Sequence, residues 1–399
     1  MAQPKSPTDD RASTPDPTAP DVLDPAPGNG DLRRELLLMK AFQSRIAGPV
    51  LRRFADPQQI LETGMGFWPS RVVLTAVELG VFTELAVRPL SQQELLDRLN
   101  WHPRAAGPFL NALVDMSLLR RDRAGRYTNS RQAALFLDRA KPSYIGGLME
   151  LSSTRLYDLW SGLGDLLRTG NPGAEEEQGE SEFFSTLYGD QTALRKFLAG
   201  MTGISTGEAM LIAARFPWKR FRTFLDVGAA QGALPVRVAL THSHISGVSY
   251  DLPAVQPIFE EYVESFGLGD RIRFTSGDMF AGPLPSADVI SFGHVLHGYS
   301  ETVRRELIAK AYAAVPPGGA LLVYDAMTDP GRKQNLISSL SSLNIMLEMR
   351  EGFEATTTQC ADWFREAGFV NIKKRHLIGP TSMVYGRKPG SLSRSNDGY

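Results

Sequence analysis

The sequence is poor in cysteine, in charge of one sign and in long apolar runs. Its 399 residues include a single cysteine, Cys360, so no disulfide can form within the chain. Lys and Arg number 43 against 44 Asp and Glu, which excludes a global field that would recruit nucleic acid or an anionic membrane. No run approaches the roughly 20 apolar residues of a membrane span, and the N-terminus lacks the apolar stretch of a secretory signal. We therefore expect a cytoplasmic protein with no nucleic-acid and no membrane partner.

Most of the chain has the composition of an ordered protein with large cores. Hydrophobic residues make up 42% of it and charged residues 22%, and its length exceeds what one core usually spans. Residues 1–30 differ, because they hold seven prolines, five aspartates and almost nothing large and apolar. We predict a disordered arm over 1–30 and a similar disordered tail over 389–399.

The first half of the chain predicts a winged helix over residues 31–140. Apolar residues recur at helical spacing over 32–46 and again over 71–79. A capping box opens a helix over 91–99, and a further helix over 104–113 follows a proline. A short hairpin over 118–128, which turns at an Ala-Gly pair, then supplies the wing.

A winged helix serves either in DNA recognition or in dimerisation. The wing gathers several arginines, namely Arg120, Arg121, Arg123, Arg126 and Arg131. However, the helix over 104–113 that would enter the major groove is mostly apolar and has few groups that read base edges. We therefore favour dimerisation and expect a homodimer.

The second half of the chain predicts a doubly wound α/β sheet. From about Phe221, short apolar strands alternate with helices, which is typical of a parallel sheet covered on both faces. We expect seven strands in a Rossmann-like domain over 216–388, joined to the winged helix by a helical segment over 141–215. The expected strands are Thr223–Val227, Gly247–Asp251, Ile272–Ser276, Asp288–Phe292, Ala320–Asp325, Ile372–Leu377 and Ser382–Gly386.

The ends of the first three strands predict an adenosine site, because ligands of such sheets bind outside the C-terminal strand ends. The first strand runs into a turn of small residues from Asp226 to Gly232. The second ends in Asp251, 25 residues after Asp226, near the spacing at which an acid meets a ribose diol. The third is followed by Asp278 and apolar neighbours that suit an adenine. The turn lacks the Gly-x-Gly-x-x-Gly pattern of NAD sites, and no Gly-Lys-Ser/Thr follows for ATP.

The ordered motifs over about residues 32–388 resemble a known family. The run Asp-Val-Gly, Asp-Leu-Pro, Gly-Asp-Met-Phe, Leu-His and Pro-Gly-Gly is similar to that of the bacterial and plant small-molecule O-methyltransferases, which include caffeate-type and hydroxyneurosporene-type enzymes. The resemblance implies S-adenosyl-L-methionine as the cofactor. The residues assigned to it are Ser205, Asp226, Gly228, Asp251, Leu252, Asp278, Met279, Phe280, Gly293 and Tyr299.

The same resemblance implies a general base after the fourth strand. The family has Leu-His-Asp-Trp where this chain has Leu296-His297-Gly298-Tyr299, so His297 takes the place of the base. An imidazole near its ordinary pKa can accept the proton of a phenol or an enol at neutral pH. The carboxylates assigned to orient it are Asp325 and Glu354. Gly298 replaces the family's Asp, and Tyr299 replaces a Trp that covers the adenine, where tyrosine can still stack.

The residues assigned to the acceptor side are Phe197, Met201, His294 and Asn344. Phe197 and Met201 lie four apart on one helix face, a spacing that core packing explains equally well. His294 and His297 are three apart, which invites a metal site, but residues 328–368 contain no further histidine. We therefore predict no metal.

The predicted reaction is methyl transfer to a hydroxyl of a small, aromatic or polyketide-like acceptor of secondary metabolism. One alternative keeps the fold and the cofactor but performs pericyclic, hydroxylation or decarboxylation chemistry, since Gly298 removes a carboxylate from the site. Carbon or nitrogen as the acceptor atom is a milder alternative. A remote one is a DNA-binding regulator, against which Asp251, Asp278 and His297 together argue.

Overall fold

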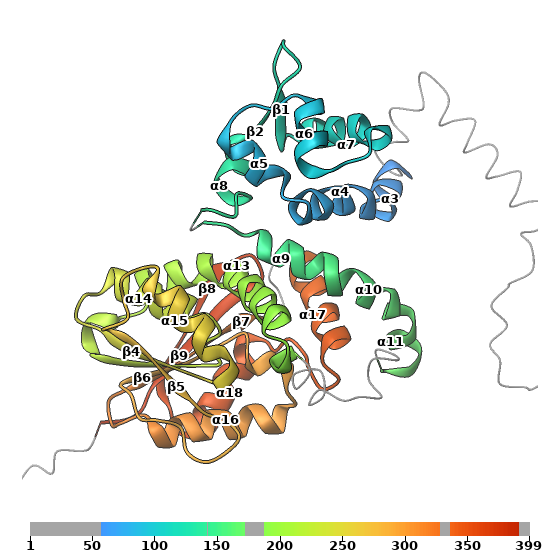
Figure 1. Ribbon diagram of the computed structural model, residues 1–399. Coiled ribbons are helices and arrows are strands. Elements are labelled where there is room, and N and C mark those ends of the chain that lie inside the picture. Colours follow the sequence, from blue (N-terminus) through green and yellow to red (C-terminus); the bar gives the residue numbers. More distant parts are fainter. Residues whose placement is uncertain (1–56, 142, 172–186, 328–335, 391–399) are drawn as a thin grey trace, which may run out of the picture. The chain divides into compact units, whose positions relative to one another are not determined.

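The computed structural model describes residues 57–141, 143–171, 187–327 and 336–390 (Figure 1). The predicted arm over 1–30, the predicted helix over 32–46 and the tail from residue 391 lie outside these ranges. The chain divides into two compact units, residues 1–67 and 68–399. That division lies at none of the predicted domain boundaries, which therefore stay predictions.

The first described helices and a two-stranded hairpin build a winged helix. Its apolar core gathers buried residues from α4, α5, α6, α7 and both strands, including Phe82, Leu95, Leu110 and Tyr127. The predicted capping box is present, because Ser91 accepts from the Glu94 N–H while Glu94 accepts from the Ser91 N–H. The elements of the winged helix are α4 Phe67–Glu78, α5 Val81–Val87, α6 Gln92–Leu99, α7 Pro103–Asp115, β1 Leu119–Arg121, β2 Tyr127–Asn129 and α8 Arg131–Phe136. Helix α3, Pro57–Gly64, precedes them in the chain and has no buried residue. The sequence did not predict α5 and α8 as separate helices.

The helical segment that follows is broken where the sequence predicted one stretch. It comprises α9 Gly146–Leu151, the π-turn η1 Ser152–Leu156, α10 Tyr157–Leu159, the 3₁₀ turn η2 Trp160–Gly162 and α11 Leu163–Thr169. The long helix α13, Gln191–Arg215, begins at Asp190, whose side chain accepts from two backbone N–H groups of the first turn. By length and composition α13 could cross a bilayer, which the sequence had not indicated. Its buried residues pack against α9 and α14, as in a core helix of a globular domain.

A seven-stranded sheet forms the second half, as predicted. The strand order is β5-β4-β3-β6-β7-β9-β8, with parallel pairing from β5 to β7 and antiparallel pairing of β9 with both neighbours. The strands are β3 Thr223–Val227, β4 Ser246–Asp251, β5 Ile272–Ser276, β6 Val289–Gly293, β7 Ala320–Ala326, β8 Val370–Ile378 and β9 Thr381–Arg387. The C-terminal ends of the five parallel strands therefore share one edge of the sheet.

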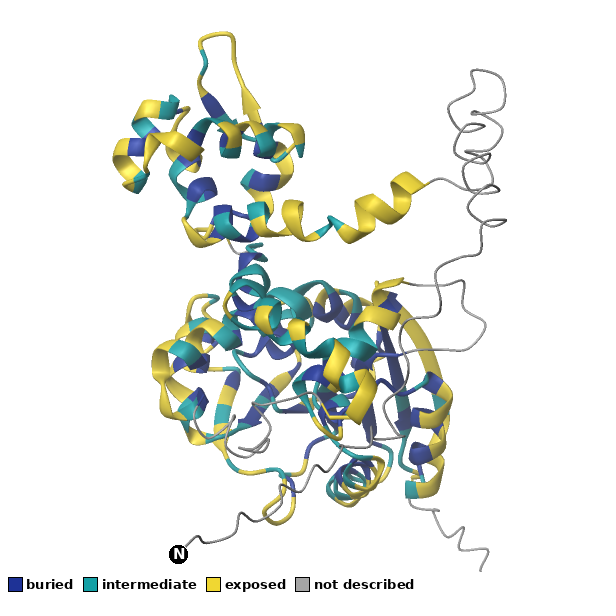
Figure 2. Ribbon diagram, turned by 90° about the vertical axis from the view of Figure 1, so that its right-hand side faces the viewer, coloured by how far each residue is buried: buried dark blue, intermediate teal, exposed yellow. Residues whose placement is uncertain are grey.

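Helices cover both faces of this sheet, and successive strand residues point to opposite faces. In β3, Phe224 packs with the core under α13 and α14 (Ala233–Thr241), whereas Leu225 and Val227 pack with the core under α16 (Glu301–Ala314) and α18 (Thr357–Ala367). Helix α15, Gln256–Glu264, covers β5. The remaining helices are η4 Trp218–Arg220, η5 Pro253–Val255, η6 Leu296–Gly298 and α17 Leu336–Glu348. Figure 2 shows the buried strands enclosed between these helices and the exposed tip of the β1–β2 hairpin.

Candidate active site

The turn after β3 requires glycine at its first position. Gly228 has φ +70°, in the left-handed region, and a Cβ on it would lie 2.6 Å from a methyl carbon of Val295. Its N–H donates to the Tyr250 carbonyl at 2.9 Å, which ties the turn to the end of β4. Only glycine fits here, because the turn packs closely against Val295 at the carboxyl edge of the sheet, where ligands of such sheets bind.

Asp251 ends β4 beside this turn. One carboxylate oxygen accepts the Ala230 N–H at 2.9 Å and the other accepts the Leu252 N–H at 2.8 Å. Burial raises the pKa of Asp251 to about 6, although the two backbone N–H groups act in the opposite direction. The carboxylate is therefore fixed in orientation at the place where the sequence predicted a ribose contact.

An aromatic pair stands at the neighbouring strand end. The exposed Asp278 accepts the Phe280 N–H at 2.8 Å, and the Phe280 ring packs edge-on against the Tyr299 ring with centroids 5.3 Å apart. Phe280 is 49% exposed although large and apolar. A carboxylate beside aromatic faces suits an adenine, so the residues present at this edge fit an adenosyl group.

Asp226 is placed differently from the other residues predicted to bind the cofactor. It is buried within the sheet and accepts the Ser291 hydroxyl of β6 at 2.5 Å. Burial raises the pKa of this carboxyl to about 7. Its side chain thus bridges two strands in the sheet interior, because position 226 lies inside β3 rather than beyond its end.

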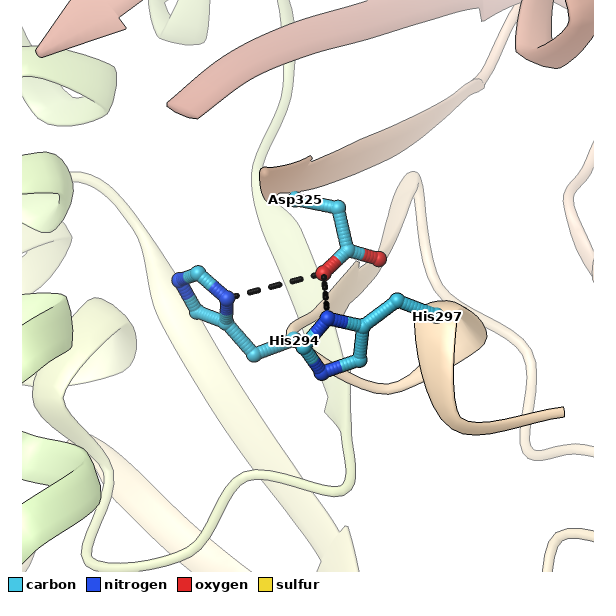
Figure 3. Close-up of side chains that lie close together, drawn as sticks. All are labelled: His294, His297 and Asp325. Carbon is cyan, nitrogen blue, oxygen red and sulfur yellow. Dashed lines mark ion pairs between the residues drawn. The ribbon is translucent and has the colours of Figure 1, made fainter. Parts of the chain in front are cut away.

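His297 lies in η6 against two buried carboxylates (Figure 3). Its Nδ1 is 3.3 Å from Asp325 Oδ1 and 3.2 Å from Glu354 Oε1. Burial alone would lower the pKa of His297, but the two carboxylates outweigh it and raise that pKa. Burial alone would raise the pKa of Asp325, but the two facing imidazoles outweigh it and lower that pKa. The structure thus brings together the three residues predicted to be catalytic, and Nε2 is the ring nitrogen left for proton transfer.

Arg304 of α16 fixes this arrangement, and sequence reasoning missed it. Its buried guanidinium donates to the carbonyls of Tyr299, His297 and Phe353 at 2.6 to 2.9 Å. It also lies 3.6 Å from the centroid of the Phe353 ring. Arg304 therefore joins the His297 turn to the segment that carries Glu354.

His294 does not present its polar atoms to an acceptor, as its predicted place on the acceptor side requires. Its Nε2 is 2.6 Å from a carboxylate oxygen of Glu208, and its Nδ1 is 3.5 Å from Asp325 Oδ1. Ligand atoms of His294, His297 and Asp325 lie within 4.8 Å of one another, close enough for a metal ion. Because each imidazole already faces a carboxylate at ion-pair distance, we interpret the group as a cluster of paired charges.

The other predicted acceptor residues have protein partners as well. Asn344 of α17 accepts the Trp160 indole N–H at 2.9 Å and donates to Glu348. Glu348 also pairs with Arg155 at 2.7 Å, so α17 is joined to the η1–η2 segment. Phe197 packs against a buried core cluster, whereas Met201 is half-buried on α13. Of the remaining predicted cofactor residues, Ser205, Leu252, Met279 and Gly293 are half-buried.

Two more residues near the site were not predicted. Glu208 of α13 is buried at 4% exposure beside His294. Tyr188 precedes α13, and its pKa is raised by burial and by Asp251 and Tyr299, which places it near the cofactor edge. Neither belongs to a motif. A lone acid at an apolar position of the α13 pattern was the only available signal for Glu208.

The doubly wound sheet and its edge define an S-adenosylmethionine-dependent methyltransferase: a glycine turn, an oriented carboxylate, an aromatic pair and a half-buried imidazole share the ligand-binding end. Comparison with known proteins gives the family. Residues 160–370 match the O-methyltransferase domain and residues 61–139 match the O-methyltransferase dimerisation domain. The chain belongs to this O-methyltransferase family.

The chain is similar to characterised enzymes over most of its length. It is 40% identical to the tetracenomycin polyketide synthesis 8-O-methyl transferase TcmO of Streptomyces glaucescens, over 84% of this chain and 97% of that protein. It is 36% identical to the N,N-dimethyltransferase OxyT of Streptomyces rimosus, over 79% and 91%. Among solved structures, human N-acetylserotonin methyltransferase in complex with S-adenosylmethionine matches with a TM-score of 0.76 at 25% identity, over 84% of this chain and 98% of that one.

Proposed function

We propose that this methyltransferase methylates a phenolic or enolic hydroxyl of an aromatic polyketide acceptor, with His297 as the general base. The observation that carries the proposal is His297 Nδ1 facing both Asp325 and Glu354. Two carboxylates hold the proton on Nδ1 and stabilise the imidazolium that forms when Nε2 takes a second proton. The similarity to TcmO supports a polyketide as the acceptor class.

The residues at the carboxyl edge would hold the cofactor, which when bound supplies an electrophilic methyl group on a sulfonium. Gly228 shapes the turn beside the cofactor edge, Asp251 is oriented for the ribose hydroxyls, and Phe280 and Tyr299 offer aromatic faces to the adenine. His297 then removes the proton of the acceptor hydroxyl. Holding the two reactants in place supplies much of the rate acceleration of such a transfer.

The arrangement also bears on the loss of the family's Asp at Gly298. Gly298 is buried in η6, and His297 still faces Asp325 and Glu354, the two carboxylates that the family resemblance assigns to orient the base. The imidazole therefore keeps acidic partners without an acid at position 298. This favours methyl transfer over pericyclic, hydroxylation or decarboxylation chemistry.

An acceptor panel tests the proposal. The purified enzyme is incubated with S-adenosylmethionine and matched aromatic polyketides that carry a free hydroxyl, a blocked hydroxyl or an amine in its place. We expect S-adenosylhomocysteine and an O-methyl product in equal amounts, from the free hydroxyl alone. Preferential methylation of the amine would show an N-methyltransferase, the activity that the name of OxyT gives. Chemical conversion of the acceptor without formation of S-adenosylhomocysteine would establish the non-methylating alternative.

The proposal also covers the partners and the location of the enzyme. The dimerisation domain supports a homodimer acting on a small molecule. We propose a cytoplasmic enzyme without nucleic-acid or membrane partners, which the balance of 43 basic and 44 acidic residues supports. Salt-dependent binding to duplex DNA would contradict this part.

A further inference from the structure

A carboxylate that the methyl-transfer mechanism does not use lies behind the active site. Glu208 of α13 is 4% exposed, and its Oε1 accepts the Thr381 hydroxyl of β9 at 2.5 Å. Its other oxygen is 2.6 Å from His294 Nε2. A buried carboxylate is costly unless a positive charge and hydrogen bonds compensate it. Among the described residues, His294 is the cationic group in direct contact with Glu208.

His294 lies between two carboxylates from different elements. Glu208 of α13 faces one ring nitrogen, and Asp325 of β7 faces the other at 3.5 Å. Its backbone has φ +52°, a left-handed conformation that is unfavourable for a non-glycine residue. Its N–H donates to the Tyr324 carbonyl at 3.1 Å, and its ring packs edge-on against the Tyr324 ring. The surrounding structure therefore holds this imidazole in a strained but defined position.

Asp325 is shared by both histidines. The same oxygen, Oδ1, is 3.5 Å from His294 Nδ1 and 3.3 Å from His297 Nδ1, and the two rings are 5.7 Å apart between centroids (Figure 3). The groups that face His297 are thus Asp325 from β7, Glu354 from the segment after α17, His294, and Arg304 from α16, which donates to the His297 carbonyl. The groups that face His294 are Glu208 from α13, Asp325 and Tyr324 from β7, and His297.

We infer that His294 is a positioning residue that tunes the base: as a cation between Glu208 and Asp325, it keeps Asp325 ionised and makes His297 a weaker base than two carboxylates alone would make it. This inference rests on the proposed role of His297. A base whose proton affinity matches the working pH is more effective than one that is always protonated. With His294 present, Asp325 and Glu354 can orient His297 without keeping it protonated at the working pH.

The charges of the cluster agree with this role. Burial opposes protonation of His294, but Glu208 and Asp325 outweigh it and raise the pKa of His294 well above its usual value. Carboxylates face both ring nitrogens of His294, and only the imidazolium form can donate to both, so the geometry favours a protonated His294. The positive charge of His294 in turn acts to lower the pKa of His297.

The test compares His294→Gln with Glu208→Gln, His294→Lys and the control His242→Gln. His242 is a half-buried histidine that faces the Ala213 carbonyl at 2.8 Å and lacks a carboxylate partner among the described residues. The acid limb of kcat/KM for the acceptor is measured at saturating S-adenosylmethionine. In parallel, NMR titration of labelled histidine rings follows His297 without turnover, its signals assigned from a His297→Gln spectrum.

For His294→Gln we expect the midpoints of the acid limb and of the His297 titration to rise by about one pH unit. This is the effect of losing the partly screened positive charge of His294, whose ring centroid lies 5.7 Å from that of His297. Glu208→Gln should shift both in the same direction by less, and His294→Lys should return them toward wild type. His242→Gln should shift neither. A rate that falls at every pH with no shift of the limb or of the titration would overturn the inference.

Further measurements cover the cases in which the variants above would not decide the question. If His294→Gln does not fold, as judged by its thermal transition, the titration in Glu208→Gln decides the question. If a chelator abolishes wild-type activity or shifts its titration, a metal rather than a proton links the histidines and the inference is wrong. If the wild type methylates no hydroxyl, the proposed function fails, while the titration still decides whether His294 tunes His297.

Discussion

At the scale of single residues, the site consists of titratable side chains that are packed against one another. His297, Asp325, Glu354 and His294 form one electrostatic group, and Arg304 holds the backbone around it through three carbonyls. The titration of each member therefore reports on its neighbours.

The first prediction concerns the basicity of His297. The carboxylates of Asp325 and Glu354 raise its pKa above the usual 6.5, so the free enzyme should carry a protonated His297 at pH 6.5. NMR titration of the ring in the cofactor-free protein should give a midpoint above that value. Adding S-adenosylmethionine should lower the midpoint, because its sulfonium repels the imidazolium. A midpoint below 6.5 in the free enzyme would contradict the ion-pair geometry.

The second prediction concerns Asp226, whose pKa burial raises from 3.8 to about 7. Between these values the unfolded chain is ionised while the folded protein holds the proton, so the stability that this carboxyl contributes is lost as the pH rises. Relative to Asp226→Asn, the wild type should lose stability from about pH 4 to pH 7 and change little above. Urea unfolding across this range measures the difference. A difference independent of pH would show that Asp226 is ionised in the fold.

At the scale of elements, the strands were predictable and the helical additions were not. Short apolar runs identified each strand of the sheet to within one or two residues. The signal is strongest for the inner strands β3, β6 and β7, because strands buried on both faces have continuous hydrophobic segments. Helices α5 and α8 have six or seven residues, too few for a 3.6-residue period to stand out. The π-turn η1 has no sequence signature, so the sequence predicts the helical segment over 141–215 without this break.

The site was predictable where function lies in motifs at strand ends. Asp251, Asp278, His297 and Asp325 each follow or end a strand of the sheet, and parallel pairing brings those ends to one edge. Glu208 and Arg304 lie within helices, where nothing in the sequence shows which face turns inward against His294 or the His297 turn. Their roles depend on tertiary contacts with residues 86 and 7 positions away.

The third prediction tests the turn after β3. Gly228→Ala places a Cβ at 2.6 Å from Val295 in a left-handed backbone, so we expect lower stability and weaker cofactor binding, by roughly tenfold, or 1.4 kcal/mol. Gly267→Ala is the matched control, because Gly267 also has a positive φ of 64° but its Cβ would meet nothing within 4 Å. Calorimetry with S-adenosylhomocysteine and thermal unfolding measure both effects. Equal losses in the two variants would assign them to backbone strain alone.

At the scale of the whole molecule, the two family domains have separate tasks. The dimerisation domain spans residues 61–139, and the five parallel strands and the candidate site lie in the O-methyltransferase domain over 160–370. The start of the described chain exposes several large apolar side chains, which suits burial in an interface rather than contact with water. They are Ile60, Leu61, Phe67 and Trp68.

The fourth prediction concerns assembly. Light scattering should give a mass near twice the 43.8 kDa of the chain. Replacing Ile60 and Leu61 by Asp should weaken the dimer, because both are largely exposed in the single chain and would be buried between copies. Val87→Asp, at a site 77% exposed, serves as the control for a new surface charge. A wild-type monomer at micromolar concentration would contradict the assignment.

The measurement that tests the account most directly is single-turnover methyl transfer by His297→Gln, with cofactor affinity measured on the same preparation. The account predicts a rate about 100- to 10,000-fold below wild type at saturating acceptor, with S-adenosylmethionine bound within threefold of wild-type affinity. Glutamine keeps a polar group beside Asp325 and Glu354 but accepts no proton at neutral pH. An unchanged rate, or a loss explained entirely by weaker cofactor binding, would contradict the claim that this imidazole removes the acceptor proton.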